Sequence, residues 1–463
     1  MIDKIKVWCL SSKEKTFIKN QKNRDFAKKS ISIFQCAQDF DYLDLLTDVA
    51  KLDKNQIHGI HPRILYTNFY WRILLIPYFL KWVNHFFLRK KWKKLYSSIG
   101  VSKFYYVNGL NGWVYVLNLI RSIKAFSQIK NKSDILSLTQ KTIKCGDLIY
   151  DSYLRFEKKP TVSIYGLTLI SYIHDCFNQI SYYDNLSQKI KIDNFYCPYS
   201  TYISHGIPVR VFLKNNINVQ MIRYTGTGEI KTKILSLEDC LHLNPYWKFK
   251  EILNTQKSKE ELILKGYNHF KQRFDGFADL SYMKENQYAF NNSDTTFTES
   301  FEGVVFLHDF FDSPHVYREM LFEDFYEWLD WLMKLTIKHS LNIAFKPHPN
   351  QLPENQKIID SFKLKYPNIK WIDKSISNKI IFSSGIKYGL SVYGTVLPEL
   401  AFHGIKPISC GDNPASDFDF VFQAKTKSEY EYLILNHFNL NLPEDLANQL
   451  GGYYYMNYLY KFN

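Results

Sequence analysis

The stretch LSVYGTVLPELAFHGIKPI, residues 390–408, decides the fold because it holds a strand, a tight turn, a helix and the start of another strand. Apolar residues run up to Ser391, Gly394 permits a turn, and Thr395 is a residue type that begins helices. Gly404 is typical of a helix end, and a second apolar run follows it. This order predicts two parallel strands joined by a helix.

The same alternation continues on both sides of this stretch. Apolar strand patterns take turns with helical patterns, which have apolar residues at three- and four-residue spacing. Strands are expected in GVVFLHDF (303–310), NIAFKPH (342–348), IKWID (369–373) and KYGLSV (387–392), and helices over 316–339, 354–366 and 428–438. This order predicts a parallel, doubly wound sheet over 303–435, in which ligands bind at the carboxyl ends of strands.

The first half of the chain gives weaker patterns. We expect a strand in KIKVWCL (4–10), a strand, turn and helix over 103–123, and a helix or strand followed by a strand over 206–224. The polar stretch 290–298 is the expected domain boundary. We therefore predict an N-terminal domain over 1–297, a C-terminal domain over 298–440 and a tail over 441–463.

Length and composition narrow the class of protein. A chain of 463 residues with 17% aromatic and 22% charged residues is globular, and its length favours two domains. Its formal charge of +14 suits a nucleic acid, an anionic membrane surface or a phosphorylated substrate, although the lysines are spread along the chain. No RNP, zinc-finger or interleaved basic and aromatic strand pattern is present, so we expect no nucleic-acid partner.

The seven cysteines indicate the compartment. None forms a CxxC pair, which argues against a zinc ribbon or a disulfide framework and for a reducing environment. The start of the chain has no apolar signal segment, and no run reaches the length of a spanning helix. We expect a cytoplasmic protein.

The sequence Lys-Pro-His-Pro, residues 346–349, ends one of the expected strands. Its two prolines are incompatible with a helix interior and with a central strand. They would hold Lys346 and His348 rigidly at the ligand-binding edge of the sheet, which lowers the entropy cost of ordering them on a phosphate. The alternative is a surface turn with a solvated lysine.

The helix after Thr395 offers a second expected contact. A helix start has free N–H groups and the positive end of the dipole, which together favour an anion. Glu399 lies one turn into this helix, where a carboxylate can accept hydrogen bonds from a ribose diol. The alternative is a capped helix with an incidental glutamate.

The two motifs together, Lys-Pro-His-Pro and then Ser-x-Tyr-Gly-Thr about 45 residues later, resemble the donor-binding half of GT-B glycosyltransferases. The pattern is similar to that of bacterial capsule and surface-polysaccharide enzymes, a group that includes Kdo transferases, HP-motif sialyltransferases and CDP-glycerol-dependent glycerophosphotransferases. The resemblance covers about 300–435 and includes GIKPISCGDNP (404–414). It implies a GT-B-like α/β fold, with two Rossmann-type domains facing a cleft, and chemistry that needs neither metal nor cofactor.

The resemblance also implies roles for individual residues of the donor site. His348 would contact the nucleotide or its phosphate, Ser391 and Thr395 would hold phosphate beside the Gly394 turn, and Glu399 would bind ribose. Lys346 would add positive charge.

Four side chains that can transfer a proton or bind a metal fall within eight residues of the stretch 306–320: His308, Asp309, Asp312 and His315. Asp309, Asp312 and His315 are candidate catalytic groups facing the cleft between the domains. The same stretch also permits a helix that starts at Ser313-Pro314 with Asp312 or Ser313 as its cap, or a metal site.

The N-terminal half should hold the acceptor and the catalytic base. Asp147, Asp151 and Arg155 follow at four-residue steps on one helical face, where either aspartate could be a general base and Arg155 could bind the acceptor. An ordinary ion pair along the helix is the alternative. His205 and Arg210 are further acceptor-binding candidates, and His61-Pro62 is a weaker second copy of the His-Pro motif.

The stretch 69–96 combines aromatic residues with a basic end. Such a stretch can bind an anionic membrane surface, here the inner face of the cytoplasmic membrane. A core helix with a solvated basic end is the alternative.

The resemblance implies a glycosyltransferase that moves a sugar from a nucleotide-activated donor, CMP-linked as one option, to a saccharide or lipid-linked saccharide. A CDP-polyol phosphotransferase of teichoic-acid-like polymer synthesis is the nearest alternative. A non-enzymatic basic binder of membrane or nucleic acid, and a metal-dependent hydrolase that uses 308–315, are others.

Overall fold

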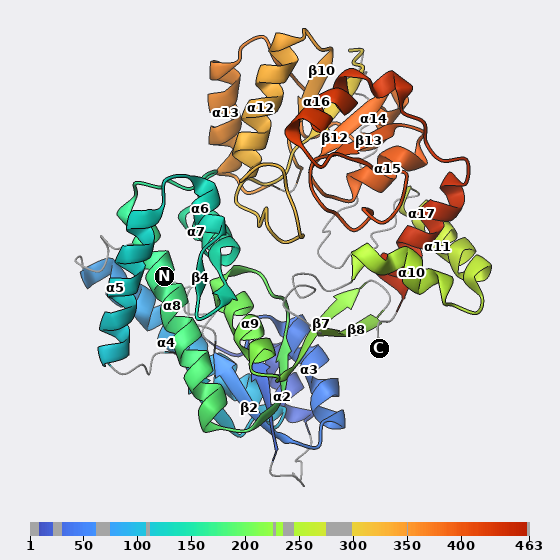
Figure 1. Cartoon of the computed structure of the whole chain (residues 1–463). Helices are drawn as coiled ribbons and strands as arrows, with labels where there is room; N and C mark the ends of the chain where they lie inside the picture. Colours follow the sequence, from blue (N-terminus) through green and yellow to red (C-terminus); the bar gives the residue numbers. More distant parts are fainter. Residues whose placement is uncertain are drawn as a thin grey trace.

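The computed structural model describes residues 9–21, 30–61, 75–107, 112–225, 228–234, 245–274, 299–349 and 351–460, with the backbone alone for 75–85 and 223–234. Two domains, each built on one sheet, lie one above the other in Figure 1. The expected strand over 4–10 falls almost entirely outside these residues, as do the proline of the His61-Pro62 motif and the start of the basic stretch 69–96.

The sheet of the first domain has six strands in the order β3-β2-β1-β6-β7-β8. They are β1 (Ile31–Gln35), β2 (Gln56–His61), β3 (Lys103–Tyr106), β6 (Ile192–Cys197), β7 (Asn218–Thr225) and β8 (Gly228–Ile234). All pairs are parallel except β7 with β8, which is antiparallel. Counted along the sheet, this is the Rossmann order 3-2-1-4-5-6 with a reversed last strand.

The sheet of the second domain repeats that order as β11-β10-β9-β12-β13-β14, and every pair is parallel. Its strands are β9 (Gly303–Phe306), β10 (Ile343–Lys346), β11 (Lys370–Trp371), β12 (Tyr388–Ser391), β13 (Lys406–Ser409) and β14 (Phe422–Gln423). The predicted doubly wound sheet over 303–435 and the predicted pair of Rossmann-type domains are confirmed. In each sheet the switch in strand order falls beside the first strand, between β1 and β6 and between β9 and β12.

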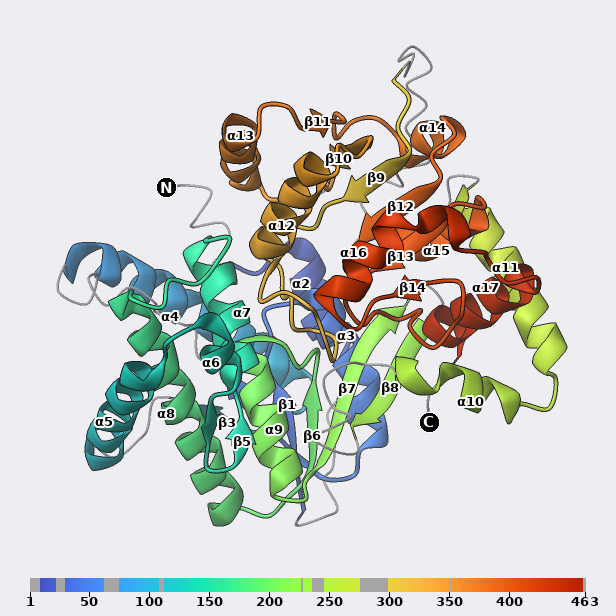
Figure 2. The ribbon, with the colours of Figure 1, turned by 45° about the horizontal axis from the view of Figure 1, so that its top comes forward.

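Helices cover both sheets (Figures 1 and 2). Those of the first domain are α2 (Ser12–Lys19), α3 (Phe40–Leu52), α4 (Leu75–Ser98), α5 (Gly112–Gln128), α6 (Lys132–Leu136), α7 (Gly146–Glu157), α8 (Leu167–Lys189) and α9 (Ile207–Lys214). A small hairpin of β4 (Thr139–Gln140) and β5 (Ile143–Lys144) precedes α7. Both the predicted strand and helix over 103–123 and the helix and strand over 206–224 are present.

The helices of the second domain are α12 (Phe325–Lys338), α13 (Asn355–Lys365), α14 (Asn378–Ser383), α15 (Val396–Phe402) and α16 (Lys427–Leu435). The prediction that a helix starts near 316 is wrong, because α12 begins only at Phe325, with Asp324 as its N-cap. Residues 316–324 are a loop whose backbone bonds to the loop after β13. Met320 bridges to Gly411, and the Leu321 N–H donates to the Cys410 carbonyl at 2.9 Å.

A third group of helices lies against the second domain: α10 (Phe249–Asn254), α11 (Lys259–Phe274) and α17 (Leu446–Tyr454). Figures 1 and 2 both show the red α17 beside the yellow-green α11. The two helices touch at glycines, since a Cβ on Gly266 would lie 2.1 Å from the Gly451 carbonyl oxygen. The domain boundary at 297/298 borders residues that the structure does not describe, and it stays a prediction.

None of the helices in the described part of the chain is long and apolar enough to cross a bilayer. The six described cysteines are unpaired, and five of them are buried in the two domains.

Candidate functional site

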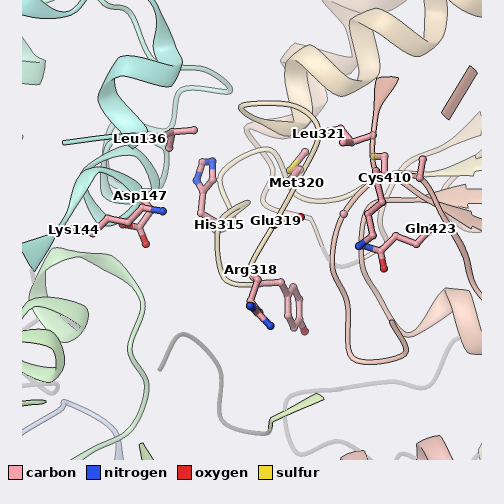
Figure 3. Close-up of a pocket in the computed structure, with 14 residues that line it drawn as sticks. Leu136, Lys144, Asp147, His315, Arg318, Glu319, Met320, Leu321, Cys410 and Gln423 are labelled. Atoms are coloured by element: carbon pink, nitrogen blue, oxygen red, sulfur yellow. The ribbon is translucent and has the colours of Figure 1, made fainter. Parts of the chain in front are cut away.

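A cavity of about 290 Å³ lies where the two domains meet. Figure 3 shows side chains from both domains around it. The first domain contributes Leu136, Lys144 and Asp147, and the second contributes His315, residues 317–321, Cys410, Gly411 and residues 423–425. The cavity therefore borders the loops after β9, β13 and β14, at the carboxyl edge of the second sheet, where ligands of doubly wound sheets bind.

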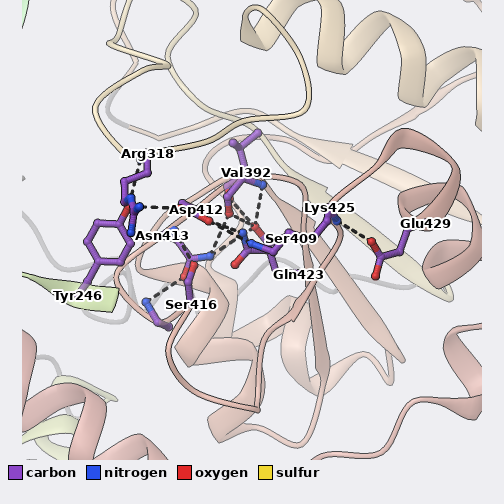
Figure 4. Close-up of polar contacts among 12 residues, drawn as sticks. Tyr246, Arg318, Val392, Ser409, Asp412, Asn413, Ser416, Gln423, Lys425 and Glu429 are labelled. Carbon is purple, nitrogen blue, oxygen red and sulfur yellow. Dashed lines mark hydrogen bonds and ion pairs between the residues drawn. The ribbon is translucent and has the colours of Figure 1, made fainter. Parts of the chain in front are cut away.

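One wall of this cavity is a rigid loop after β13, within the motif GIKPISCGDNP (Figure 4). Ser409 Oγ lies 2.6 Å from the Val392 carbonyl oxygen and also accepts the Gly411 N–H at 3.3 Å. Asn413 Nδ2 donates to the Gly411 carbonyl at 3.2 Å, and Gln423 Nε2 donates to Asp412 Oδ1 at 2.5 Å. These bonds fix the loop before any ligand binds.

Asp151 and His315 bridge the two domains beside the cavity. Asp151 lies on α7 and is 2% exposed, while His315 lies on the loop after β9. His315 Nδ1 and Asp151 Oδ1 are 2.6 Å apart. Within the described residues, the buried His315 Nε2 has no hydrogen-bond partner. The arrangement holds one ring nitrogen with a carboxylate and leaves the other for a ligand.

Burial and mutual attraction shift the pKa values of Asp151 and His315. Burial raises the pKa of Asp151 to about 6, and the nearby His315 opposes that rise. Burial lowers the pKa of His315, but the Asp151 carboxylate outweighs it, so the pKa of His315 is raised from its ordinary value. A histidine that a carboxylate holds at one ring nitrogen is suited to proton transfer at the other.

Asp147 and Arg210, predicted as a catalytic and an acceptor-binding residue, are partners of each other. The guanidinium donates to both carboxylate oxygens, at 2.7 and 2.5 Å, and also to the Lys144 carbonyl at 2.7 Å. Both side chains are buried. Burial opposes ionisation of Asp147, but Arg210 overrides it and holds the pKa of Asp147 below its ordinary value. The pair joins α7 to α9 and so positions Asp151.

Arg155 and Asp312 face each other across the domains. Arg155, at the end of α7, makes no hydrogen bond or ion pair within 4 Å to any described residue. Desolvation by the surrounding protein raises the pKa of Asp312, and Arg155 acts in the opposite direction. Among the described residues Asp312 accepts the neighbouring Ser313 N–H, at 3.0 Å, and it caps no helix, because the next helix after it begins at Phe325.

Asp309 is engaged by the backbone rather than facing a ligand. Its Oδ2 accepts the Leu352 N–H and its Oδ1 accepts Asn355 Nδ2, both at 2.9 Å. Asn355 Oδ1 in turn accepts the Phe310 N–H at 2.9 Å. These bonds tie the loop after β9 to the start of α13, which follows the Lys-Pro-His-Pro turn.

The Lys-Pro-His-Pro turn follows β10, as predicted, but its two basic side chains differ. Lys346 is 2% exposed and donates to Asn378 Oδ1 at 3.0 Å. Burial lowers the pKa of Lys346 to about 8, against the effect of Glu399. His348 is half-buried. Burial, and then Lys346, lower the pKa of His348 to about 4, so its imidazole is neutral at pH 7.

Glu399, predicted to bind ribose, forms a buried ion pair at 3.0 Å with Arg273 of α11. Thr395 stands at the N-cap position of α15 but makes no side-chain capping bond. Since α15 has only seven residues, its dipole is small. Gly394 has a φ of +153°, which glycine adopts readily.

His308 occupies the switch point of the second sheet, a role that the sequence did not indicate. Its Nε2 accepts the Val392 and Tyr393 N–H groups at 3.3 and 3.4 Å and lies 3.1 Å from Ser391 Oγ. Its ring stacks on Phe325 at 4.6 Å between centroids. Burial, and then His348, lower the pKa of His308 to about 3. In the sequence, the one signal for this role was the position of His308 directly after the first strand of the sheet.

His205 lies at the switch point of the first sheet, but it follows β6 and not the first strand β1. Its Nδ1 lies 2.8 Å from Gln35 Oε1, and Gln35 Nε2 donates to the Ser204 carbonyl at 3.0 Å. The Tyr199 ring lies 4.1 Å from it, centroid to centroid. Burial lowers the pKa of His205 to about 3. The structure thus places His205 at a switch point, and Gln35, which the sequence did not indicate, fixes its tautomer.

Two further predictions concern His61 and metals. His61 ends β2 and stacks between Phe104 and Tyr106, as expected of a packed residue. Within the residues that the structure describes, no three His, Cys, Asp or Glu side chains gather closely enough to hold a metal ion.

Two Rossmann-type domains that share a cavity at the strand carboxyl ends define the GT-B fold, and the chain has that fold. No protein-family model matches the sequence, and no curated protein matches it.

Several solved structures are similar at low identity. UDP-GlcNAc 2-epimerase of Methanocaldococcus jannaschii, in complex with UDP-GlcNAc and UDP, is 11% identical with a TM-score of 0.33, over 92% of this chain and 97% of its own. Two structures of KpsC from Thermosulfurimonas dismutans, a beta Kdo 2,4 transferase and a beta Kdo 2,7 transferase, are 11% and 14% identical, with TM-scores of 0.34 and 0.32. They cover 57% and 59% of this chain and 79% of their own. The fold assignment rests on the strand orders and parallel registers above.

Proposed function

We propose that the chain is a glycosyltransferase of capsule or surface polysaccharide synthesis, which transfers a sugar from a nucleotide-activated donor to a saccharide acceptor. The observation that carries the proposal is the Asp151–His315 pair. It joins the two domains at the edge of the shared cavity, and no described residue bonds to the second ring nitrogen. Because His315 lines the cavity and no described residue bonds to Nε2, this nitrogen is the one assigned to receive the proton.

In this proposal His315 is the general base. When the imidazole is neutral and Nδ1–H is held by Asp151, the lone pair lies on Nε2. The acceptor hydroxyl gives its proton to Nε2 as its oxygen bonds to the anomeric carbon of the donor sugar. At the same time, the bond from that carbon to the nucleotide phosphate breaks, and the electron pair leaves with the phosphate. Asp151 stabilises the imidazolium that forms.

The donor phosphate lies along the carboxyl edge of the second sheet, near His348 and the hydroxyl of Thr395. Ser391, predicted to hold phosphate, is 1% exposed and donates its hydroxyl to the Phe306 carbonyl at 3.3 Å, so it supports the turn. A neutral His348 can donate one N–H to it, and the negative charge of the phosphate favours protonation of the ring. This electrostatic stabilisation replaces a metal ion. Lys346, Glu399 and Asp309 have protein partners and support these groups from behind.

The acceptor lies between the domains. Arg155 and Asp312 offer a cation and a carboxylate to saccharide hydroxyls at the cleft, and His205 borders it from the first sheet. Asp147 and Arg210 hold α7 in place for Asp151.

A nucleotide panel tests the donor half of the proposal. CMP, CDP, UDP and GDP are added separately at saturating concentration, and thermal unfolding of the parent, His348→Ala and His339→Ala proteins is followed. At least one nucleotide should stabilise the parent, by about 2.7 kcal/mol at a hundred times its Kd. His348→Ala should weaken this effect, whereas His339, at the end of α12 and paired with Glu431, is a control that should change nothing.

Cytidine nucleotides acting alone would favour a CMP- or CDP-linked donor. A parent protein that none of the four stabilises would contradict the proposal.

A further inference from the structure

Helix α5 exposes a stripe of large apolar side chains. Its outer face carries large apolar side chains at helical spacing: Trp113, Val116, Leu117, Ile120 and Ile123. Trp113 is 73% exposed and Ile120 is 59% exposed. A surface helix of a water-soluble domain normally turns such a stripe toward the core.

The inner face of the same helix combines apolar residues such as Ala125 and Phe126, which pack against the core, with two polar ones. Asn118 and Ser122 are fully buried. Asn118 Nδ2 donates to Asn178 Oδ1 and to Ser181 Oγ of α8, both at 3.0 Å, and Ser122 Oγ donates to the Asn118 carbonyl at 2.6 Å. These bonds fix the rotation of α5 on α8, so the apolar stripe faces outward because of the fold and not through loose packing.

The charge around this face has one sign. The sequence has no Asp or Glu between Asp53 and Asp134, and this stretch contains 14 Lys or Arg residues. Arg121 and Lys124 are exposed on α5 itself. Helix α4 adds further exposed cations, and Figures 1 and 2 place α4 and α5 on the same side of the first domain. On α4, exposed apolar and basic side chains follow one another: Phe86, Phe87, Lys90, Lys93 and Lys94.

We propose that the outer face of α5 docks the first domain onto an anionic lipid surface. Apolar side chains that include a tryptophan would enter the interface, and the surrounding cations would contact lipid headgroups. A second copy of the chain fits less well, because two such faces would bring like charges together without an acid between them. This surface is centred on α5, outside the stretch 69–96, and α4, which contains most of that stretch, extends it. It does not depend on the proposed reaction.

Vesicle flotation tests the proposal on the full chain. Vesicles of phosphatidylcholine, with and without phosphatidylglycerol, are mixed with the parent protein, with Leu117→Asp/Ile120→Asp and with Leu364→Asp. Leu364 lies on α13 of the second domain and is 85% exposed, which makes it a matched control. All three substituted positions are exposed, so unfolding curves should show that the variants fold.

The parent and Leu364→Asp should bind vesicles that contain phosphatidylglycerol, more weakly as salt is added. The α5 variant should bind roughly tenfold more weakly or worse, since burial of two large apolar side chains is lost. Equal binding by the α5 variant and the parent, or equal binding to neutral and anionic vesicles, would overturn the proposal. If the parent dimerises in solution through α5 and does not bind vesicles, the proposal is also overturned, and a second copy of the chain is the partner of this face.

Discussion

The two domains share a strand order, but the histidine at the switch point has different hydrogen-bond partners in each. Each places a histidine there, and burial lowers the pKa of each to about 3. In the first domain a side chain holds His205, through Gln35, and no described residue bonds to Nε2. In the second domain Nε2 of His308 accepts the backbone N–H groups of residues 392 and 393. The backbone N–H groups at the switch point of the second sheet are therefore occupied, whereas no described residue uses the Nε2 lone pair of His205.

Each domain also has one buried pair of arginine and carboxylate. The bond between Arg210 and Asp147 is bidentate, and these two groups neutralise each other. The pair of Arg273 and Glu399 is different, because Glu399 also acts on the charge of Lys346. The second domain thus stores an extra buried cation beneath its proposed phosphate site.

The largest expected effect is the loss of stability when either ion pair is broken, and its dependence on pH distinguishes the two pairs. Asp147→Asn and Glu399→Gln should each lower the free energy of unfolding by roughly 3–5 kcal/mol, because each leaves a buried guanidinium without its carboxylate. In Glu399→Gln the pKa of Lys346 should fall further, so Lys346 is neutral in the folded state and protonated in the unfolded state. The unfolding free energy of this variant should then rise with pH from below pH 8 upward. Urea unfolding at several pH values measures both effects.

Arg210 does not titrate, so the unfolding free energy of Asp147→Asn should vary at alkaline pH as that of the parent does, including the rise above pH 8 that Lys346 causes in both. If Glu399→Gln keeps near-parental stability but binds nucleotide more weakly, the ion-pair account fails, and Glu399 binds ribose as the resemblance implied.

The next effect separates the two histidines. His308→Ala removes an aromatic stack and several hydrogen bonds and should cost about 3 kcal/mol, whereas His205→Ala should cost about 1 kcal/mol. Both histidines bind a proton in the unfolded state near pH 6.5 but not in the folded state until about pH 3. Stability should therefore fall as pH drops through this window, by about 1.4 kcal/mol per pH unit for each histidine.

Urea unfolding of His308→Ala between pH 4 and pH 7 should show a flatter dependence on pH than the parent. An unchanged slope would mean that His308 is protonated in the folded state, and the account of its bonds to the backbone would fail.

The local sequence predicted the second domain well because its elements depend on neighbouring residues. Apolar runs, Gly404 and the prolines of the Lys-Pro-His-Pro turn act over a few positions, so the order of strands and helices and the place of that turn followed. The loop over 316–324 was predicted as a helix, because its apolar spacing is helical. Its backbone bonds instead to residues 410–412, and no local pattern shows that distant partner.

The candidate site was only partly predictable for the same reason. Asp151 and His315 were named for their residue types, yet their pairing joins positions 164 residues apart. The partners of Asp147 and Glu399, at Arg210 and Arg273, are also remote, 63 and 126 residues away in the chain. Helix α5 has an amphipathic pattern, but the pattern does not tell which face turns outward. That depends on the polar groups of α8.

The pH dependence of the reaction in the parent and in Asp151→Asn tests the central claim most directly. The donor is a sugar linked to the nucleotide that gives the largest thermal shift, and nucleotide release is followed with saccharide acceptors. In the parent, kcat/KM should rise with pH through a pKa above the ordinary value of 6.5, because His315 must lose its proton and Asp151 raises its pKa. In Asp151→Asn that pKa should fall, and the rate should drop roughly a hundredfold or more. Equal rates and an unmoved pKa in the two proteins would contradict the assignment of His315 as the base.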